Sequence, residues 1–425
     1  MFLKFCDLNL KFTITMFEEV QEIQKIVDEG PPRPEFRSRE TVETFTVSFC
    51  DNEEAFRDLK DEWNHLLDHA ARKSAFLRHE FMLAWWEIHG RRLRGATPFI
   101  LIARDRERRL VGLLPLYRGK SREPLIGVRE LRFLGSVHEA PEYLDIIVAD
   151  NAQTPQIIKA MLNGLKNLRA KYDLLRLTDM AEDALLLAFL PNWATACGGE
   201  FRQLPWMVCP HIKISGDFEN YLQTVSSNHR ANFRRRQRKL NEACQVTMEI
   251  AATPAQVEKD FDTLFALHQK RWAQREDTSA FNNETSRLFH RRVAKVMAEN
   301  NLARIFSLKC DDKTVAALYC FLYGNRLMYY QAGFDIDYES QSVGLVLMGM
   351  LLQHCHEQGW SEFDFLRGEE EYKFRWTKTT RATVAGEIAV NTRAKIYLNG
   401  LQALRHLKER ARVLLSHINS AKAKK

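Results

Sequence analysis

The sequence lacks the patterns that define several large classes of protein. No apolar run reaches the roughly 18 residues that a membrane-spanning helix needs. The first 17 residues mix Lys and Asp among apolar residues, unlike the core of a signal peptide. There is no P-loop, no G-x-G-x-x-G after an expected strand and no G-x-S-x-G nucleophile elbow. We therefore expect neither a transmembrane protein nor a Rossmann dehydrogenase, a P-loop NTPase or an α/β-hydrolase.

Cysteine is scarce and scattered. No two of the eight cysteines are three residues apart, and none lies beside a histidine pair with zinc-binding spacing. Cys355 lies between His354 and His356, but consecutive residues of a helix point in different directions. The sequence therefore predicts no metal site. Cysteines without a disulfide framework are typical of a reducing compartment, so we expect a cytoplasmic protein.

What the sequence does have is an ordinary globular composition with a basic balance. Of 425 residues, 45% are hydrophobic and 28% are charged, which provides apolar material for two domains or three small ones. The formal net charge is +7. This excess fits a phosphate-bearing ligand such as coenzyme A or RNA, or an anionic membrane surface, and equally a protein with no such partner.

Apolar periodicity predicts α/β structure in both halves of the chain. The first half is expected to form a strand at 41–49, helices at 51–70 and 81–89, strands at 98–103, 110–117, 131–134 and 143–148, a helix at 153–171 and a strand at 174–177. The second half is expected to form a basic helix at 226–243, a strand at 246–250, helices at 255–275 and 284–300, strands at 303–309, 315–322 and 327–334, a helix at 343–358, a strand at 362–366 and a helix at 392–417.

The same order of elements occurs twice, which predicts an internal duplication. We expect a flexible lead-in at 1–40, domains at 41–205 and 206–395, and a C-terminal helix with a basic tail at 396–425. Each domain would be a mixed, largely antiparallel sheet flanked by helices. It would not be a Rossmann fold, because the elements do not alternate as βαβ units.

The start of the expected 343–358 helix is a candidate binding segment, made of Gln341, Ser342, Val343 and Gly344. A helix N-terminus offers free backbone N–H groups and the positive end of the helix dipole, so it can hold the pyrophosphate of an acyl-CoA. Gly344 would let the backbone approach the phosphates closely. The alternative is an ordinary helix start capped by Ser340 or Ser342.

The stretch that begins at Asp364 is the candidate catalytic segment. It ends an expected strand, and ligands bind at strand ends in open α/β sheets. Acyl transfer to an amine needs a base for the amine proton and a hydrogen-bond donor for the tetrahedral oxyanion. Asp364 or one of Glu369–Glu371 would be the base. Tyr372 or Lys373 would be the donor, and the alternative is an exposed acidic turn.

The helix expected at 226–243 is a candidate phosphate-binding surface. Arg230, Arg234 and Arg238 fall at i, i+4 and i+8, so they share one face. Such a face can contact the phosphates of coenzyme A, RNA or lipid. We favour an anionic partner over the alternative, a solvated helix packed through its few apolar residues.

A fourth segment, from Glu142 to Asp145, begins the strand expected at 143–148. Polar side chains at the mouth of a first-half strand could reach a cleft between the two domains. The alternative is an ordinary strand start with no role in a site.

The ordered motifs are Gly112-Leu-Leu-Pro-Leu116, Tyr143-Leu-Asp145, the basic 227–240 helix, Leu267-His-Gln-Lys-Arg-Trp272, Gly333-Phe-Asp335, Val343-Gly344 and Phe363-Asp-Phe-Leu-Arg-Gly-Glu369 with Tyr372-Lys373. Over roughly residues 45–395 this order resembles the BioF2-like or CelD-type acetyltransferases. That family is a branch of the GNAT superfamily and is related to the FemAB peptidyltransferases.

The resemblance implies two GNAT-like modules that face each other, with the donor site and the catalytic cleft mostly in the second. Residues 341–346 would form the pyrophosphate loop, although Val346 replaces the final small residue of the superfamily pattern Q/R-x-x-G-x-G/A. Family members are often linked to exopolysaccharide or cell-envelope synthesis. FemAB-like relatives use aminoacyl-tRNA as donor, which the basic helix would also suit.

The leading hypothesis is an acyltransferase that moves an acyl group from acetyl-CoA or another acyl-CoA, used as a cosubstrate, to an amine or hydroxyl of a small molecule or an envelope precursor. Arg230 and Arg234 would help Gly344 and its neighbours to bind the donor. One alternative is a FemAB-like aminoacyl transferase with tRNA as partner, and another is a non-catalytic GNAT scaffold in envelope polysaccharide assembly. The enzymatic interpretation requires Gly344 and Tyr372 to border a common hollow.

Overall fold

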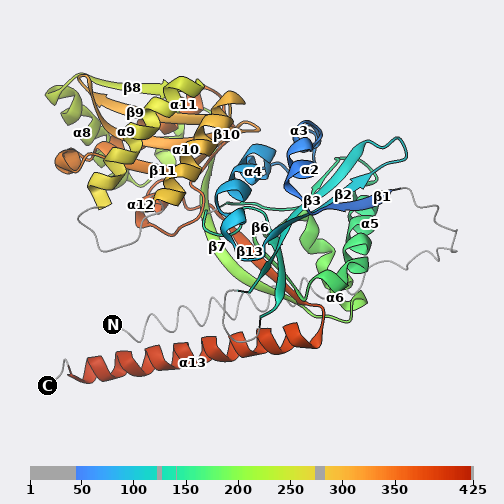
Figure 1. Cartoon of the computed structure of the whole chain (residues 1–425). Helices are drawn as coiled ribbons and strands as arrows, with labels where there is room; N and C mark the ends of the chain where they lie inside the picture. The colour runs from blue at the N-terminus through green and yellow to red at the C-terminus, as the bar shows by residue number, and fades with distance from the viewer. Residues whose placement is uncertain (1–44, 122–126, 140, 273–282, 423–425) are drawn as a thin grey trace, which may run out of the picture. The chain divides into compact units, whose positions relative to one another are not determined.

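The computed structural model describes residues 45–121, 127–139, 141–272 and 283–422 (Figure 1). The lead-in expected at 1–40 lies outside these residues, as do the last three residues of the basic tail. The described chain is a mixed α/β protein, as predicted. None of the helices in this part of the chain is long and apolar enough to cross a membrane.

The first half largely follows the predicted order of elements. Its strands are β1 Thr46–Cys50, β2 Thr97–Arg104, β3 Leu110–Lys120, β4 Arg129–Phe133, β5 Ile147–Val148 and β6 Leu174–Ala181. Its helices are α2 Glu53–Asp58, α3 Lys60–Asp68, α4 His79–Ile88, α5 Thr154–Asn167 and α6 Leu190–Ala196. Apolar residues of α5 such as Ile157, Met161 and Leu165 recur one turn apart and are buried, which is the helical periodicity that the sequence displayed.

The second half also follows the predicted order. Its strands are β8 Val246–Ala251, β9 Ala303–Cys310, β10 Lys313–Tyr323, β11 Arg326–Phe334 and β12 Glu362–Asp364. Its helices are α7 Phe218–Thr224, α8 Ser227–Ala243, α9 Pro254–Trp272, α10 Glu284–Glu299, α11 Val343–Glu357 and α12 Glu371–Phe374. The remaining elements are β7 Phe201–Lys213, β13 Thr380–Ala389 and α13 Thr392–Lys422.

The described strands form one hydrogen-bonded path in the order β1-β2-β3-β4-β6-β13-β7-β12-β11-β10-β9-β8, with β5 paired to β3. On each side of β13 and β7 the same pattern occurs. Neighbouring strands pair antiparallel until the last pair, β4 with β6 in the first half and β11 with β12 in the second, which is parallel. The repeated order confirms the predicted duplication.

The sequence pattern did not predict β7 or β13, which join the two halves. β7 pairs with β13 through residues 201–210 and with β12 through residues 211–213. β13 in turn pairs antiparallel with β6. A strand from near the end of the chain therefore lies in the sheet of the first half, beside a long β7 that continues into the second half (Figure 1).

The prediction of a strand at 143–148 is wrong over its first four residues, because only Ile147 and Val148 lie in β5. Tyr143 has a left-handed backbone conformation with φ of 61°, which is incompatible with a strand. The buried Asp145 carboxylate accepts three backbone N–H groups at 2.6–3.1 Å and fixes an irregular loop. The helix expected at 51–70 is likewise two helices, α2 and α3, that meet at Leu59.

A disulfide joins Cys244, at the end of α8, to Cys310, at the end of β9. The expectation of cysteines without disulfide pairing is wrong at this pair. The two residues are separated by 66 positions in sequence, and the antiparallel pairing of β8 with β9 brings their Cα atoms to 5.4 Å. The free cysteines of the described chain are all buried.

The sheet of the second half separates two hydrophobic cores. Alternate residues of β10 face opposite sides, so Tyr319 and Phe321 belong to one core whereas Leu318 and Cys320 belong to the other. The first core also contains the helices of the first half, together with α9 and α10. The second core is formed with α8 and α11. Each face of β11 is therefore covered by a different set of helices.

Candidate functional site

Strands β11 and β12 diverge after a short parallel pairing. β12 pairs with β11 only through residues 326–328, whereas β11 continues to Phe334. After Asp364 the chain turns away at Leu366, whose φ is 54°, and at Gly368, whose φ is 120°. From Tyr329 onward, one edge of β11 therefore has no strand partner among the described residues. Its backbone groups there are left for side chains, water or a ligand to pair.

A β-bulge adds to this divergence. The register between β10 and β11 shifts so that Tyr330 is an extra residue on β11. A bulge leaves its extra residue outside the regular ladder. Nearby, the Ala332 N–H donates to the Gln331 side-chain oxygen at 3.0 Å. The strand ladder is thus irregular next to the point where the strands part.

A cavity of about 330 Å³ lies where the strands diverge, between β11, α8, α11 and the segment around α12. We call it the α11 cavity. Its lining includes His229, Asn232, Arg271, Tyr329, Phe334, Ser342, Val343, Gly344, Tyr372, Arg375 and Trp376. Gly344 and Tyr372 therefore border a common hollow, as the enzymatic interpretation requires.

The first turn of α11 presents free backbone N–H groups to this cavity. Ser342, with φ of 58°, precedes the helix, and its carbonyl accepts the N–H groups of the third and fourth helical residues. Among the described residues, no hydrogen bond is made by the N–H groups of Val343 and Gly344. A Cβ on Gly344 would meet only Phe334, at 3.7 Å, which is ordinary contact. The packing of the protein itself does not require glycine at this position.

Two tyrosine hydroxyls and a histidine are among the polar groups of the α11 cavity. The Tyr372 hydroxyl donates to the Tyr329 hydroxyl at 3.4 Å. Burial raises the pKa of Tyr372 well above its usual value and that of Tyr329 to about 12, so both stay protonated at neutral pH. Burial, reinforced by Arg375, lowers the pKa of His229, and its Nε2 has no partner among the described residues. Sequence reasoning did not single out His229, which sits within a run of arginines.

The other predicted donor-binding residues do not line the α11 cavity. Arg230 donates to the Leu222 carbonyl at 3.0 Å and so caps α7. Arg234 pairs with Glu219 at the surface. The side chain of Gln341 accepts from a neighbouring serine hydroxyl. Of the predicted binding set, the cavity therefore brings together Ser342, Val343 and Gly344.

The predicted catalytic residues are similarly divided. Tyr372 lines the α11 cavity. The buried Lys373 ammonium donates to the Arg367 carbonyl at 2.5 Å and pairs with Glu370 at 3.0 Å, so it holds the turn together. Glu369 is exposed beside it. The fourth residue, Asp364, is fully buried and lies toward the other face of the sheet.

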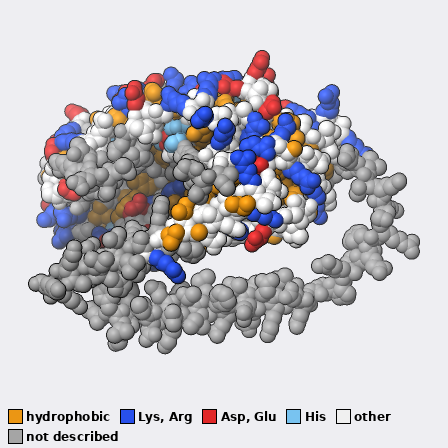
Figure 2. Space-filling view, turned by 60° about the horizontal axis from the view of Figure 1, so that its bottom comes forward, with side chains coloured by type: hydrophobic (Ala, Val, Ile, Leu, Met, Phe, Trp, Pro, Cys, Tyr) orange, Lys and Arg blue, Asp and Glu red, His pale blue; other side chains and the backbone are white. Residues whose placement is uncertain are grey.

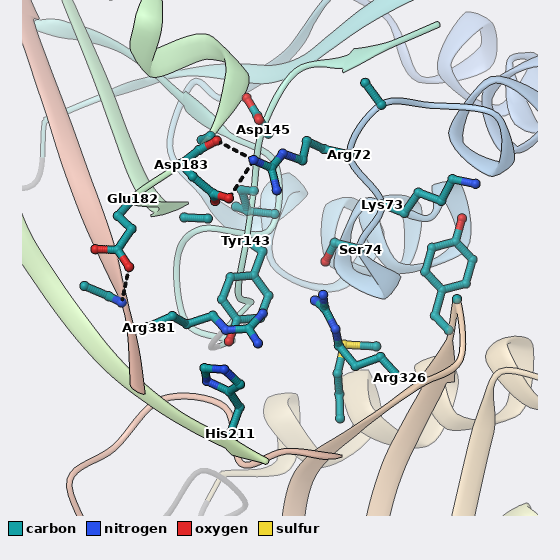
Figure 3. Close-up of a pocket in the computed structure, with 18 residues that line it drawn as sticks. Arg72, Lys73, Ser74, Tyr143, Asp145, Glu182, Asp183, His211, Arg326 and Arg381 are labelled. Atoms are coloured by element: carbon teal, nitrogen blue, oxygen red, sulfur yellow. Dashed lines mark hydrogen bonds and ion pairs between the residues drawn. The ribbon is translucent and has the colours of Figure 1, made fainter. Parts of the chain in front are cut away.

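A second cavity, of about 480 Å³, lies on that other face (Figure 3). We call it the Tyr143 cavity. Met328 lines it, whereas the next residue, Tyr329, lines the α11 cavity. Successive strand residues point to opposite faces, so the two cavities flank β11 at the same point along the strand.

Tyr143 connects this cavity to the predicted catalytic segment. Its hydroxyl donates to Asp364 Oδ2 at 2.8 Å, and burial raises the pKa of Asp364. The guanidinium groups of Arg326 and Arg381 lie 5.9 and 5.4 Å from the Tyr143 ring centre, and both point toward it (Figure 3). Two segments that the sequence singled out, more than 200 residues apart, thus meet.

Glu142, beside Tyr143, belongs to a buried junction. It pairs with Arg367, which also contacts Asp179 Oδ1 at 2.5 Å. Burial raises the pKa of Glu142 to about 7 although Arg367 acts in the opposite direction. Asp145 is held by backbone N–H groups, and burial raises its pKa to about 6. Glu142 and Asp179, through Arg367, fix the junction between the halves, whereas Asp145 fixes a loop of the first half.

His211 is one of the polar residues of the Tyr143 cavity that sequence reasoning missed, as are Arg326 and Arg381. It lies on β7, and its Cα pairs with that of Asp364 across the two strands. Burial, reinforced by Arg381, lowers the pKa of His211, which keeps the imidazole neutral at neutral pH. No sequence pattern pointed to His211, because the strand that carries it, β7, was itself not predicted. In the described chain no group of three His, Cys, Asp or Glu side chains is placed to hold a metal ion.

Comparisons with known proteins agree with this geometry. Residues 227–374, from α8 to α12, match a family model described as an acetyltransferase (GNAT) domain. No curated protein matches the chain. The structure is similar to that of FemX, with a TM-score of 0.56 and 10% identity, over 80% of this chain and 97% of that one.

Other solved structures are similar as well. A conserved protein of unknown function from Bacteroides thetaiotaomicron matches with a TM-score of 0.51 and 9% identity, over 81% of this chain and 100% of that one. A tandem GNAT protein from the clavulanic acid biosynthesis pathway has a TM-score of 0.43 and 12% identity, over 80% of this chain and 98% of that one. The chain has a fold of tandem GNAT-like modules, and residues 227–374 in its second half are similar to a GNAT-type acetyltransferase domain.

Proposed function

We propose that the protein transfers an acyl group from an activated donor in the α11 cavity to an amine or hydroxyl acceptor that enters through the Tyr143 cavity. The observation that carries this proposal is the parting of β11 and β12 with a cavity on each face. Two substrates that approach from opposite faces can meet there without competing for space. Holding both in place removes much of the entropic barrier to reaction.

The α11 cavity suits an acyl-CoA as cosubstrate. The N–H groups of Val343 and Gly344, together with the helix dipole, would hold the pyrophosphate. The amide groups of the pantetheine arm would pair with the free edge of β11, as an added strand does. This arrangement would bring the thioester to the bulge at Tyr330, where the strands part.

The chemistry would follow from the groups on the two faces. The acceptor nitrogen or oxygen attacks the thioester carbonyl carbon, and the carbon–sulfur bond breaks as the new bond forms. The Tyr372 hydroxyl, which stays protonated, and a backbone N–H at the bulge would stabilise the oxyanion. His211 would accept the acceptor's proton, with Asp364 holding Tyr143 in place. The departing thiolate takes a proton from solvent.

A second candidate is an aminoacyl transferase that uses charged tRNA. The similarity to FemX favours it, as do the exposed cations of α8, which include Arg235, Arg238 and Lys239. Lys and Arg side chains are spread over the face in Figure 2, with acidic and hydrophobic side chains between them. A non-catalytic scaffold would be favoured by a cleft filled with side chains, whereas both cavities are open.

We further propose that the protein is a BioF2-like or CelD-type member of the superfamily. Its modules would be residues 41–205 and 206–395, and it would act in the cytoplasm on a small-molecule or envelope-polysaccharide precursor. The ordered motifs from Gly112 to Lys373 support this assignment.

Calorimetric titration of the full chain with acetyl-CoA and with alanyl-tRNA tests the proposal. We expect acetyl-CoA to bind and to yield free thiol when acceptor amines are added. Binding of alanyl-tRNA that falls steeply with salt would favour the second candidate. Failure of both donors to bind would remove the proposed transferase function.

A further inference from the structure

We infer that the Tyr143 cavity binds a carboxylate or phosphate group of the acceptor, through the guanidinium groups of Arg326 and Arg381. The cavity volume, about 480 Å³, is in the range of small-molecule sites. The inference rests on the proposed function only in identifying this ligand as the acceptor. The anion site itself is argued from the residues of the cavity.

The two arginines are held by a carboxylate that lies outside the cavity lining, and they themselves line the cavity. Arg326 Nε pairs with Glu362 at 2.8 Å, and Arg381 Nη2 pairs with the other oxygen of Glu362 at 2.5 Å. Glu362 and Asp364 do not line the cavity, whereas both arginines do. The carboxylates thus orient the two guanidinium groups, which line the cavity.

Arg326 retains unused donors. Arg326 pairs with Glu362 through Nε, and no hydrogen bond from its two terminal Nη groups is found among the described residues. Such a planar pair of N–H donors matches the geometry of two oxygens of a carboxylate or phosphate. In Figure 3 the guanidinium of Arg326 points into the cavity toward Ser74 and Tyr143.

The acidic residues of the cavity do not cancel this site. The Asp145 carboxylate is occupied by three backbone N–H groups. Asp183 pairs with Arg72 at the rim at 2.6 Å. Glu182 accepts the Ala382 N–H on the wall from which Arg381 projects (Figure 3). The exposed Glu182 can also accept a hydroxyl or ammonium group from the same ligand, which would orient it between the two walls.

The anion would lie close to the reacting centre. Arg326 begins β11, and Met328, two residues further, lies at the point where β12 leaves the sheet. Side chains two residues apart on a strand share a face. An acceptor whose anionic group is bound at Arg326 could therefore place its amine or hydroxyl beside His211 and the parting strands.

Three aminoethyl compounds test the anion site: ethanolamine, β-alanine and O-phosphoethanolamine, which differ in having no anion, a carboxylate or a phosphate. We expect at least one anionic compound to raise the melting temperature of the full chain, at matched ionic strength, by more than ethanolamine does. The larger of the two shifts identifies the oxyanion. Equal shifts from all three compounds would overturn the inference.

The variant Arg326→Gln should lose the extra stabilisation, whereas Arg104→Gln should keep it. The two arginine side chains are matched, with exposed fractions of 30% and 29%, and each pairs with one glutamate. Retention of the anion effect in Arg326→Gln would contradict the assignment. Titration with acetyl-CoA separates this outcome from failure of the proposed function, because Arg326 lies outside the α11 cavity and its variant should bind the donor unchanged.

Discussion

The two halves of the molecule share the same order of strands and helices, and they differ in the first turn of one corresponding helix. In each half, a helix connects the two strands that pair in parallel, α5 between β4 and β6, and α11 between β11 and β12. The second residue of α5 is Pro155, which has no N–H group. The second residue of α11 is Gly344, whose N–H is free and whose surroundings are open.

This difference supports the proposal that the donor binds in one of the two repeats, at the start of α11. A strand–helix–strand arrangement is not sufficient to bind phosphates, because the first helical turn must also supply donors and space. The proposed acceptor side is different again, since His211 comes from β7, a strand that is not part of the repeated strand pattern. The following predictions test this division of roles, from the largest expected effect to the smallest.

Replacement of His211 by Ala should lower kcat by about 10²–10⁴-fold, the usual contribution of a general base. The affinity for acetyl-CoA should stay unchanged. Because the folded-state pKa of His211 lies below the usual value near 6.5, the wild-type rate should be constant above that value and fall as the pH drops below it. Stopped-flow measurement of thiol release across the pH range gives both the loss in kcat and the pH dependence of the rate.

His229→Ala is the matched control, because this second neutral histidine lines the donor cavity instead. It should weaken donor binding and leave the acid limb of the pH profile in place. If His211→Ala preserves that limb, the base lies elsewhere.

Glu139 should make the contact between the halves sensitive to acid. Glu139 lies in the sequence between β4 and β5. Its carboxylate pairs with His89 Nε2 at 2.7 Å and with His290 Nε2 of α10 at 2.9 Å. Although burial opposes it, these two histidines lower the pKa of Glu139 to about 2. A carboxyl with a lowered folded-state pKa stabilises the fold above the unfolded value near 4.3, and this stability is lost as the pH falls toward 2. Urea unfolding of Glu139→Gln should show a loss of roughly 2–3 kcal/mol at neutral pH that vanishes toward pH 2.

Glu62→Gln, which removes a half-exposed partner of Arg104, should cost at most about 1 kcal/mol. A Glu139→Gln variant as stable as wild type at pH 7 would show that the halves do not depend on this contact.

Gly344→Pro copies the start of α5 into α11. Proline is tolerated in the first helical turn, so the fold should persist. Donor affinity should fall by about tenfold or more, since one N–H is lost and the ring occupies the approach of the phosphates. Gly344→Ala, which keeps the N–H, should weaken binding less, as measured by titration with acetyl-CoA.

Gly349→Ala in the same helix provides the structural contrast. A Cβ there would lie 2.1 Å from the Phe233 ring, so this change should cost about 1–3 kcal/mol of stability through overpacking. Unchanged donor affinity in both Gly344 variants would mean that the first turn of α11 does not bind the donor.

The sequence predicted the α11 cavity better than the Tyr143 cavity, and the reason is physical. Gly344 begins a helix with clear apolar periodicity, and Tyr372 follows a predicted strand by a few residues, so the order of elements was enough to place them together. Arg381 and His211 depend on pairings between strands distant in sequence. The left-handed Tyr143 was mistaken for strand because tertiary contacts, not propensity, fix its conformation.

The position of β13 has a consequence for biosynthesis. Residues 380–389 pair with β6, so an emerging chain cannot close the sheet of its first half until almost all of it has left the ribosome. During that interval the edge of β6 is unpaired, and open strand edges favour aggregation. The first repeat therefore cannot complete its sheet before the second repeat has been synthesised. Because β13 pairs with both β6 and β7, its pairing completes the connection between the two halves of the sheet in one step.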